Sequence, residues 1–112
     1  MKLELKRIIL FTRNMEAMGR FYGEVLDLEL ANSAAGWKDF HAGACAIALH
    51  EGEAKAGTRP PKLAFYPADV AAVRATLTRR GAKMGKIISA PHHDMCDGKD
   101  PDGNPFQISS RK

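Results

Sequence analysis

The sequence predicts an α+β fold in which one strand–helix–strands unit is used twice. Two amphipathic helices are apparent, the first beginning after an N-cap at Asn14 and the second after an N-cap at Asp69. An apolar strand precedes each helix, at residues 5–12 and 62–66. The two N-caps lie 55 residues apart (69 − 14), which indicates an internal repeat.

The first helix carries its apolar side chains at spacings of three and four, which predicts one buried stripe. This stripe consists of Met15, Met18, Tyr22, Val25 and Leu26. Alternating apolar and polar residues then predict strands at 37–41 and 44–50, which would pair around Gly43.

The second helix has a shorter stripe of Val70, Val73 and Leu77, and Gly81 is its predicted left-handed C-cap. Strands are predicted at residues 86–89 and 95–99. Residues 100–104, Asp-Pro-Asp-Gly-Asn, combine the residues that turns require, and the run 106–109 alternates like a half-buried closing strand.

This turn entering a closing strand resembles the C-terminal signature of the glyoxalase/bleomycin resistance/dioxygenase (vicinal oxygen chelate) superfamily. The resemblance extends to residues 14–16, to Phe21-Tyr22 and to Leu26-Asp27, where the family often has Leu-Gly. It covers essentially the whole chain. It implies a single glyoxalase-like domain of two βαβββ modules, whose curled mixed sheets surround a cavity. Module one would span 1–52, the linker 53–61 and module two 62–112.

Composition limits the classes of partner. With 112 residues and 45% hydrophobic content, the chain suits one compact domain. The net charge of +4 is dispersed, and the basic residues at 79–86 complement a helix C-terminus, so no nucleic-acid partner is expected. No segment resembles a secretory signal or a membrane span. Cys45 and Cys96 are too few for a disulfide framework, which favours a cytoplasmic protein with reduced thiols.

Metal-using members of the family draw ligands from the first and last strands of each module. Carried over position by position, the resemblance assigns these places to Arg7, Ala48, Lys62 and Gln107. Arginine and alanine donate no lone pair, lysine must first lose a proton, and one amide oxygen is a weak ligand. The expectation is therefore no metal and no other cofactor, and whether the protein is an enzyme stays open.

The tract from His92 to Asp97 also combines imidazole, carboxylate and thiol groups. Adjacent residues of a strand point to opposite faces, so this tract is interpreted as a polar lid loop, with a metal site as the alternative. An inward-facing His50 offers only one imidazole, and one imidazole does not make a site.

Alternation along the strands predicts which side chains face away from the helices and line the cavity. The predicted ligand-binding residues are Arg7, Phe11, Trp37, His50, Lys62, Tyr66 and Gln107. Two cations in a partly apolar pocket suit an anion, and the rings of Phe11, Trp37 and Phe40 are predicted to supply an apolar or stacking wall. In the alternative interpretation, Arg7 and Lys62 pair with local acids such as Glu4 or Asp39.

These features favour a metal-independent protein that binds a small, anionic molecule, as in the bleomycin-resistance branch. The alternative is a metal-dependent glyoxalase-like lyase or isomerase, or an extradiol-type dioxygenase. A metal-free catalyst with His50 or Tyr66 as general base is a third class, and no catalytic residue is assigned. The resemblance also implies a homodimer, for which unpaired edge strands supply a physical motive.

Overall fold

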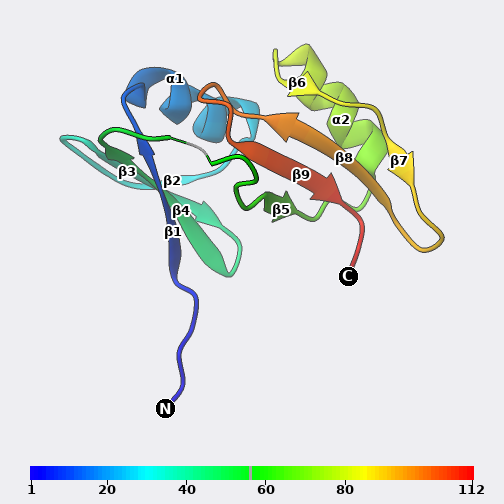
Figure 1. Ribbon diagram of the computed structural model, residues 1–112, viewed down its shortest axis with the longest axis horizontal. Coiled ribbons are helices and arrows are strands. Elements are labelled where there is room, and N and C mark those ends of the chain that lie inside the picture. Colours follow the sequence, from blue (N-terminus) through cyan, green and yellow to red (C-terminus); the bar gives the residue numbers. More distant parts are fainter. Residues whose placement is uncertain (56) are drawn as a thin grey trace. The chain divides into compact units, whose positions relative to one another are not determined.

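The computed structural model describes residues 1–55 and 57–112, which form two compact units, Met1–Lys55 and Ala56–Lys112 (Figure 1). Each unit contains a strand, a helix and further strands, and each has its own mixed sheet. The predicted α+β class with two mixed sheets is therefore confirmed. Among the described residues, no helix is both long and apolar enough to cross a bilayer.

The first unit builds a four-stranded sheet with the order β1-β4-β3-β2. Strand β1 is parallel to β4, and the other neighbours are antiparallel. The elements of this unit are β1 (Arg7–Thr12), α1 (Met15–Arg20), its π-helical continuation η1 (Phe21–Val25), β2 (Leu30–Ala34), β3 (Trp37–Ala42) and β4 (Cys45–Glu51).

The helix of the first unit buries Met18 and Tyr22 completely, as their predicted stripe requires. The sheet contributes buried side chains from alternate positions, including Phe40, Ile47 and Leu49. A Cβ added to Gly23 would lie 3.2 Å from the ring of Phe40, so the helix approaches the sheet closely at that glycine. Burial of this apolar face is what fixes the sheet's register.

The second unit builds a sheet with the order β5-β9-β8-β6, with β7 also paired to β8. Strand β5 is parallel to β9, and the other pairs are antiparallel. Its elements are β5 (Leu63–Phe65), α2 (Val70–Arg79), β6 (Lys83–Met84), β7 (Ile88–Ser89), β8 (Asp94–Lys99) and β9 (Pro105–Ser109).

Helix α2 begins and ends where the sequence predicts. The carboxylate of Asp69 accepts a hydrogen bond from the Ala72 backbone N–H at 3.0 Å, and Gly81 has a φ of +92°. Val70 and Leu77 are buried against β6, β8 and β9. Capping and the apolar stripe are local signals, which explains why they predict this helix accurately.

The turn between β8 and β9 is organised by Asp100, which is only 5% exposed. Its carboxylate accepts hydrogen bonds from the backbone N–H groups of Asp102 and Asn104, both at 2.9 Å, and from the Asn104 side-chain amide at 2.8 Å. Gly103 adopts a φ of +86°. This network closes the hairpin that aligns Gln107 with Asp97.

The structure departs from the sequence-based prediction in a few places. Strands β2 and β6 were not predicted, because β2 is exposed at every position and β6 is only 2 residues long. Asn14 precedes α1, but its side chain makes no capping bond; instead its N–H donates to the Thr12 hydroxyl at 2.9 Å. Asp27 adopts a left-handed φ of 59°, a conformation that glycine and aspartate adopt more readily than most residues.

Candidate functional site

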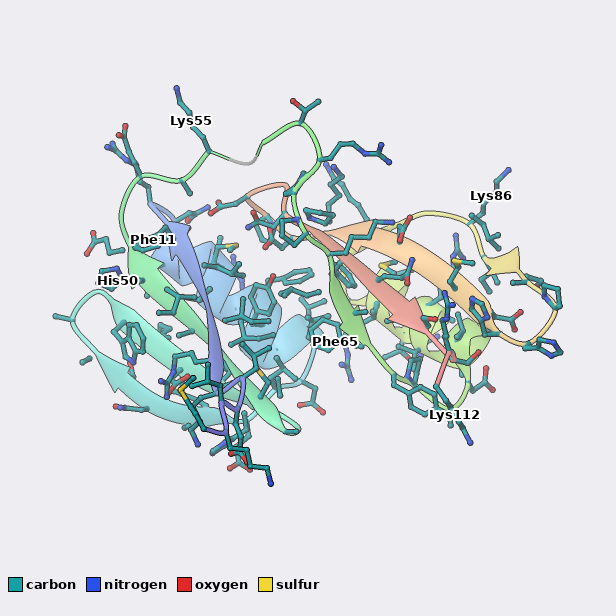
Figure 2. The ribbon with its side chains drawn as sticks, turned by 60° about the horizontal axis from the view of Figure 1, so that its bottom comes forward. Phe11, His50, Lys55, Phe65, Lys86 and Lys112 are labelled. Atoms are coloured by element: carbon teal, nitrogen blue, oxygen red, sulfur yellow. The ribbon has the colours of Figure 1, made fainter. Side chains whose placement is uncertain are left out.

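In the first unit, three ring-bearing side chains form a row across neighbouring strands. Phe11 of β1 is in register with His50 of β4, which is in register with Trp37 of β3. The centroid of the His50 ring lies 5.3 Å from that of Phe11 and 5.8 Å from that of Trp37, both in edge-to-face geometry. Figure 2 shows Phe11 and His50 beside each other at the ends of their strands.

This row is open at one side. Phe11 is 48% exposed, and His50 is exposed as well, whereas Trp37 is half-buried. Exposed rings held in place by their strands offer faces and edges for stacking at little cost in conformational entropy. The row is therefore suited to contact a planar or apolar part of a ligand.

Arg7 lies beside the row and is paired with a carboxylate of the same sheet. Its Nε and Nη2 donate to the two oxygens of Asp39 at 3.3 and 2.9 Å, and its guanidinium carbon lies 5.9 Å from the centre of the Trp37 ring. Asp39 is buried at 6% exposure. The hydrogen bond with Asp39 raises the pKa of Arg7 above its ordinary value, against an opposing contribution from desolvation. Arg7 therefore stays charged and fixed in direction.

The second unit has a comparable ion pair at Lys62, just before β5. The Lys62 ammonium lies 3.1 Å from each oxygen of Asp97, and the Gln107 side-chain N–H donates to Asp97 Oδ1 at 3.0 Å. Both members of the ion pair are about half exposed, at 48% and 50%. Tyr66 follows the last residue of β5 and is 56% exposed.

The two ion pairs occupy equivalent positions in their sheets. Asp39 is in register with Ala48, and Asp97 is in register with Gln107, so each carboxylate lies next to the predicted site residue on the last strand of its unit. Arg7 and Lys62 are therefore not the two unpaired cations that the anion-receptor prediction assumed. The alternative named Asp39 as a partner; Asp97 was missed because its role depends on the β8–β9 register.

Apart from Tyr66, the predicted site residues thus fall into one group in each unit. Arg7, Phe11, Trp37 and His50 lie together on the first sheet. Lys62 and Gln107 meet at Asp97 on the second sheet. The sequence signal that pointed to these positions was alternation along each strand.

The four positions that the family resemblance assigns to metal ligands do not fit a divalent ion. Arg7 and Lys62 are cations engaged with carboxylates, Ala48 is fully buried with only a methyl group, and the amide of Gln107 is bonded to Asp97. Within the residues that the structure describes, no three His, Cys, Asp or Glu side chains form a cluster suited to a metal.

The tract from His92 to Asp97 was predicted to be a lid loop, but its residues from Asp94 onward belong to β8, and the tract separates its potential donors. Cys96 is buried on the helix side of the sheet, where its thiol donates to the Gly85 carbonyl at 3.1 Å, whereas Asp97 is exposed on the opposite face. Burial raises the pKa of the Cys96 thiol. His92 and His93 precede the strand, in the loop that the sequence predicts.

Comparison with known proteins identifies the family. The model of the Glyoxalase/Bleomycin resistance protein/Dioxygenase superfamily matches residues 4–108, so the chain belongs to this superfamily. No curated protein sequence matches the chain.

Several solved structures share the fold. The fosfomycin resistance protein FosX from Mesorhizobium loti is 22% identical, with a TM-score of 0.80, 100% of this chain covered and 95% of that one. Lactoylglutathione lyase from Agrobacterium tumefaciens is 19% identical, with a TM-score of 0.77 and coverage of 95% and 92%. TnmS3, an antibiotic-binding protein from Streptomyces sp. CB03234, is 20% identical, with a TM-score of 0.78 and coverage of 96% and 94%.

Proposed function

We propose that this member of the superfamily is a metal-independent binding protein for a small, anionic molecule. The observation that carries the proposal is the row of Phe11, His50 and Trp37 beside the fixed Arg7 guanidinium. The rings would stack on an apolar or aromatic part of the ligand, and Arg7 would meet its charged group.

The ion pair with Asp39 leaves Arg7 able to bind a further acceptor. A guanidinium carries five N–H donors, and the bonds to Asp39 use donors on Nε and Nη2. The Arg7 side chain is 33% exposed, so its remaining donors are accessible. Asp39 would therefore orient Arg7 toward a ligand. The negative charge of Asp39 also reduces the net positive charge that the ligand would meet.

One relative supports binding as the function. TnmS3 is described as an antibiotic-binding protein. A binding protein requires a shaped, partly aromatic surface and no catalytic group. On the second unit by itself, the Lys62–Asp97–Gln107 group and the exposed Tyr66 are proposed as polar ligand-binding residues.

Trp37 is the single tryptophan of the chain, so its fluorescence reports directly on the proposed site. We expect a screen of carboxylates, phosphorylated compounds and aromatic anions to yield a ligand that changes Trp37 emission saturably. Phe11→Ala and His50→Ala should each weaken that ligand roughly ten-fold, the loss expected for one aromatic contact of about 1.5 kcal/mol. Tyr22→Phe is the matched control, because this ring is fully buried in the helix core.

A ligand that binds wild-type protein and both aromatic variants equally would place its site elsewhere and overturn the assignment. Arg7→Lys should preserve the positive charge but weaken binding of a carboxylate, because an ammonium lacks the planar fork of the guanidinium. Equal binding by Arg7→Lys would remove Arg7 from the proposed site.

The alternative is a metal-dependent lyase, isomerase or dioxygenase, and the similarity to lactoylglutathione lyase gives it a specific basis. Metal analysis of the purified protein, followed by thermal unfolding with nickel, zinc, manganese and iron(II), separates the two. One tightly bound ion per chain, with a raised unfolding temperature, would replace the binding proposal with the enzyme. The absence of both effects would support metal-independent binding.

A cytoplasmic homodimer is proposed as the working form. Strands β1 and β2 are the edges of the first sheet, and an edge strand offers unpaired backbone groups to a second chain. Light scattering coupled to size-exclusion chromatography tests this: a mass near 12.2 kDa would contradict the dimer.

A further inference from the structure

A hollow of about 390 Å³ lies on the second unit and contains an unusual concentration of positive charge. Lysine side chains contribute to it from three places: the approach to β5, strand β6 and strand β8. Its lining residues are Lys62, Lys83, Gly85, Asp97, Gly98, Lys99 and Pro105.

Strand register explains why the lysines converge. Lys83 of β6 is directly paired with Lys99 of β8, and Lys99 is directly paired with Pro105 of β9. Side chains alternate along a strand, so Lys99 shares the exposed face with Asp97, two residues away. Cys96 and Phe106 are buried on the α2 side of the sheet, so the hollow lies on the opposite face.

Like charges directly opposite each other destabilise a sheet, so the pairing of Lys83 with Lys99 is unfavourable without a counter-charge. Among the described residues, neither lysine forms an ion pair. The single carboxylate of the hollow, Asp97, is already bonded to Lys62 and Gln107. Three lysines against one aspartate leave the hollow with a formal charge of +2.

A hollow on the first unit has the opposite balance. Its lining consists of Arg13, Glu51, Gly52 and Glu53, and Arg13 is paired with Glu53 at 3.0 Å. The positive excess is therefore a local property of the second sheet and does not simply follow from the net charge of the chain.

We propose that the hollow of Lys62, Lys83 and Lys99 binds a dianionic phosphoryl-type group, either as free phosphate or as the head of a phosphate monoester. Two unpaired ammonium groups supply up to six N–H donors for the oxygens of such a group and neutralise its charge. The volume exceeds that of the group alone, so an attached organic part has room. The inference deepens the proposed function, on which it rests for the idea of an anionic ligand, by adding a phosphoryl-binding site that lies on the second unit alone.

The test uses inorganic phosphate as the probe and the whole chain of 112 residues. Phosphate binding is measured by calorimetry and by backbone amide NMR shifts, with chloride at matched ionic strength as the reference. The variant K83Q/K99Q should bind phosphate roughly ten-fold more weakly, since each lysine contributes a charge-assisted hydrogen bond. The matched control K2Q/K112Q removes the same charge near the chain termini and should change the affinity by no more than about two-fold.

Asp97→Asn provides a test of opposite sign. Removing this carboxylate raises the formal charge of the hollow and releases Lys62, so phosphate should bind more tightly than to wild-type protein. The NMR shifts should centre on Lys83, Gly85 and Lys99.

Equal weakening by K83Q/K99Q and K2Q/K112Q would show only general electrostatic attraction and overturn the inference. Reproduction of the effect by chloride would do the same. If the Trp37 screen yields a ligand but phosphate does not bind, the inference fails and the proposed function stands. If phosphate binds at Lys83 and Lys99 while no ligand changes Trp37 emission, the proposed function at the aromatic row is contradicted and the phosphate site in the hollow is supported.

Discussion

The two units have a cation–carboxylate pair at equivalent strand positions, but the large core side chain comes from a different strand in each unit. In the first unit, Phe40 of β3 is paired with Ile47 of β4. At the equivalent pair in the second unit, Gly98 of β8 is opposite Phe106 of β9. The large ring therefore sits on the inner strand in one sheet and on the last strand in the other. Each sheet therefore places one phenylalanine ring in its core at this pair, and a different strand of the pair supplies that ring.

The exposed faces differ in the surroundings of their ion pairs. Arg7–Asp39 has a buried carboxylate and a neighbouring tryptophan ring, whereas Lys62–Asp97 is half exposed and adjoins two further lysines. The repeat thus retains a cation–carboxylate pair in both units, and the neighbours make one face aromatic and the other basic.

Phe106→Ala should have the largest effect on the comparison. The ring is fully buried, so its removal should lower the free energy of unfolding by about 3–5 kcal/mol, measured by urea denaturation. Ile47→Val, at the equivalent position, should cost only about 1 kcal/mol. A similar cost for both variants would contradict the complete burial of the Phe106 ring.

Gly98→Ala tests the other member of that pair. An added Cβ would lie 2.6 Å from the Phe106 ring and 2.7 Å from Met84 Sδ, so overpacking should cost about 1–3 kcal/mol. In a Phe106→Ala background the same substitution should cost less, because the cavity accommodates the methyl group. Additive costs in a double-mutant cycle would mean that Gly98 is required for another reason.

The carboxylates of the two ion pairs should differ in their contribution to stability. Asp97→Asn should change the free energy of unfolding by no more than about 1 kcal/mol, because its pair is half exposed and screened by solvent. Asp39→Asn should destabilise the protein more, since Asp39 is buried and holds Arg7 through two hydrogen bonds. Urea denaturation at low and high salt compares them, and an equal loss would refute the difference in burial.

The smallest effect is expected from the thiols. Burial raises the folded-state pKa of Cys96, so its contribution to stability is complete below the unfolded thiol pKa of about 8.5. That contribution is lost as pH rises through the folded-state pKa. The unfolding free energy of Cys96→Ala should therefore fall less steeply above pH 8.5 than that of wild type.

Thiol labelling gives a second readout of the same difference. Cys45 is half-buried and Cys96 is 1% exposed, so a disulfide reagent should modify Cys45 first under native conditions. Equal labelling rates would contradict the burial of Cys96.

The sequence by itself determined the features that depend on local signals. The cap at Asp69, the left-handed Gly81, the stripe of Val70 and Leu77, and the turn at residues 100–104 all follow from residue type and short spacing. The offset of 55 residues between the helix N-caps predicted the internal repeat. Together with the turn at residues 100–104, it predicted the family, which the comparison confirms. Alternation along the strands identified Phe11 and His50 for one face, because side chains alternate strictly across a strand. Trp37 and Phe40 were predicted only as aromatic walls, and Phe40 is instead buried in the core.

The tertiary structure decided everything that depends on strand register. Asp97 becomes the partner of Lys62 only because the β8–β9 hairpin aligns it with Gln107. From the sequence, Lys83 was interpreted as a solvated residue near the end of the second helix. In the structure, the pairing of β6 with β8 places it opposite Lys99. Strands β2 and β6 carry too little apolar pattern to be recognised, and their neighbours hold them in the sheet. The sequence thus predicted which residues have charged or aromatic side chains on the exposed faces. The partner of each charged side chain was determined by contacts between residues distant in sequence.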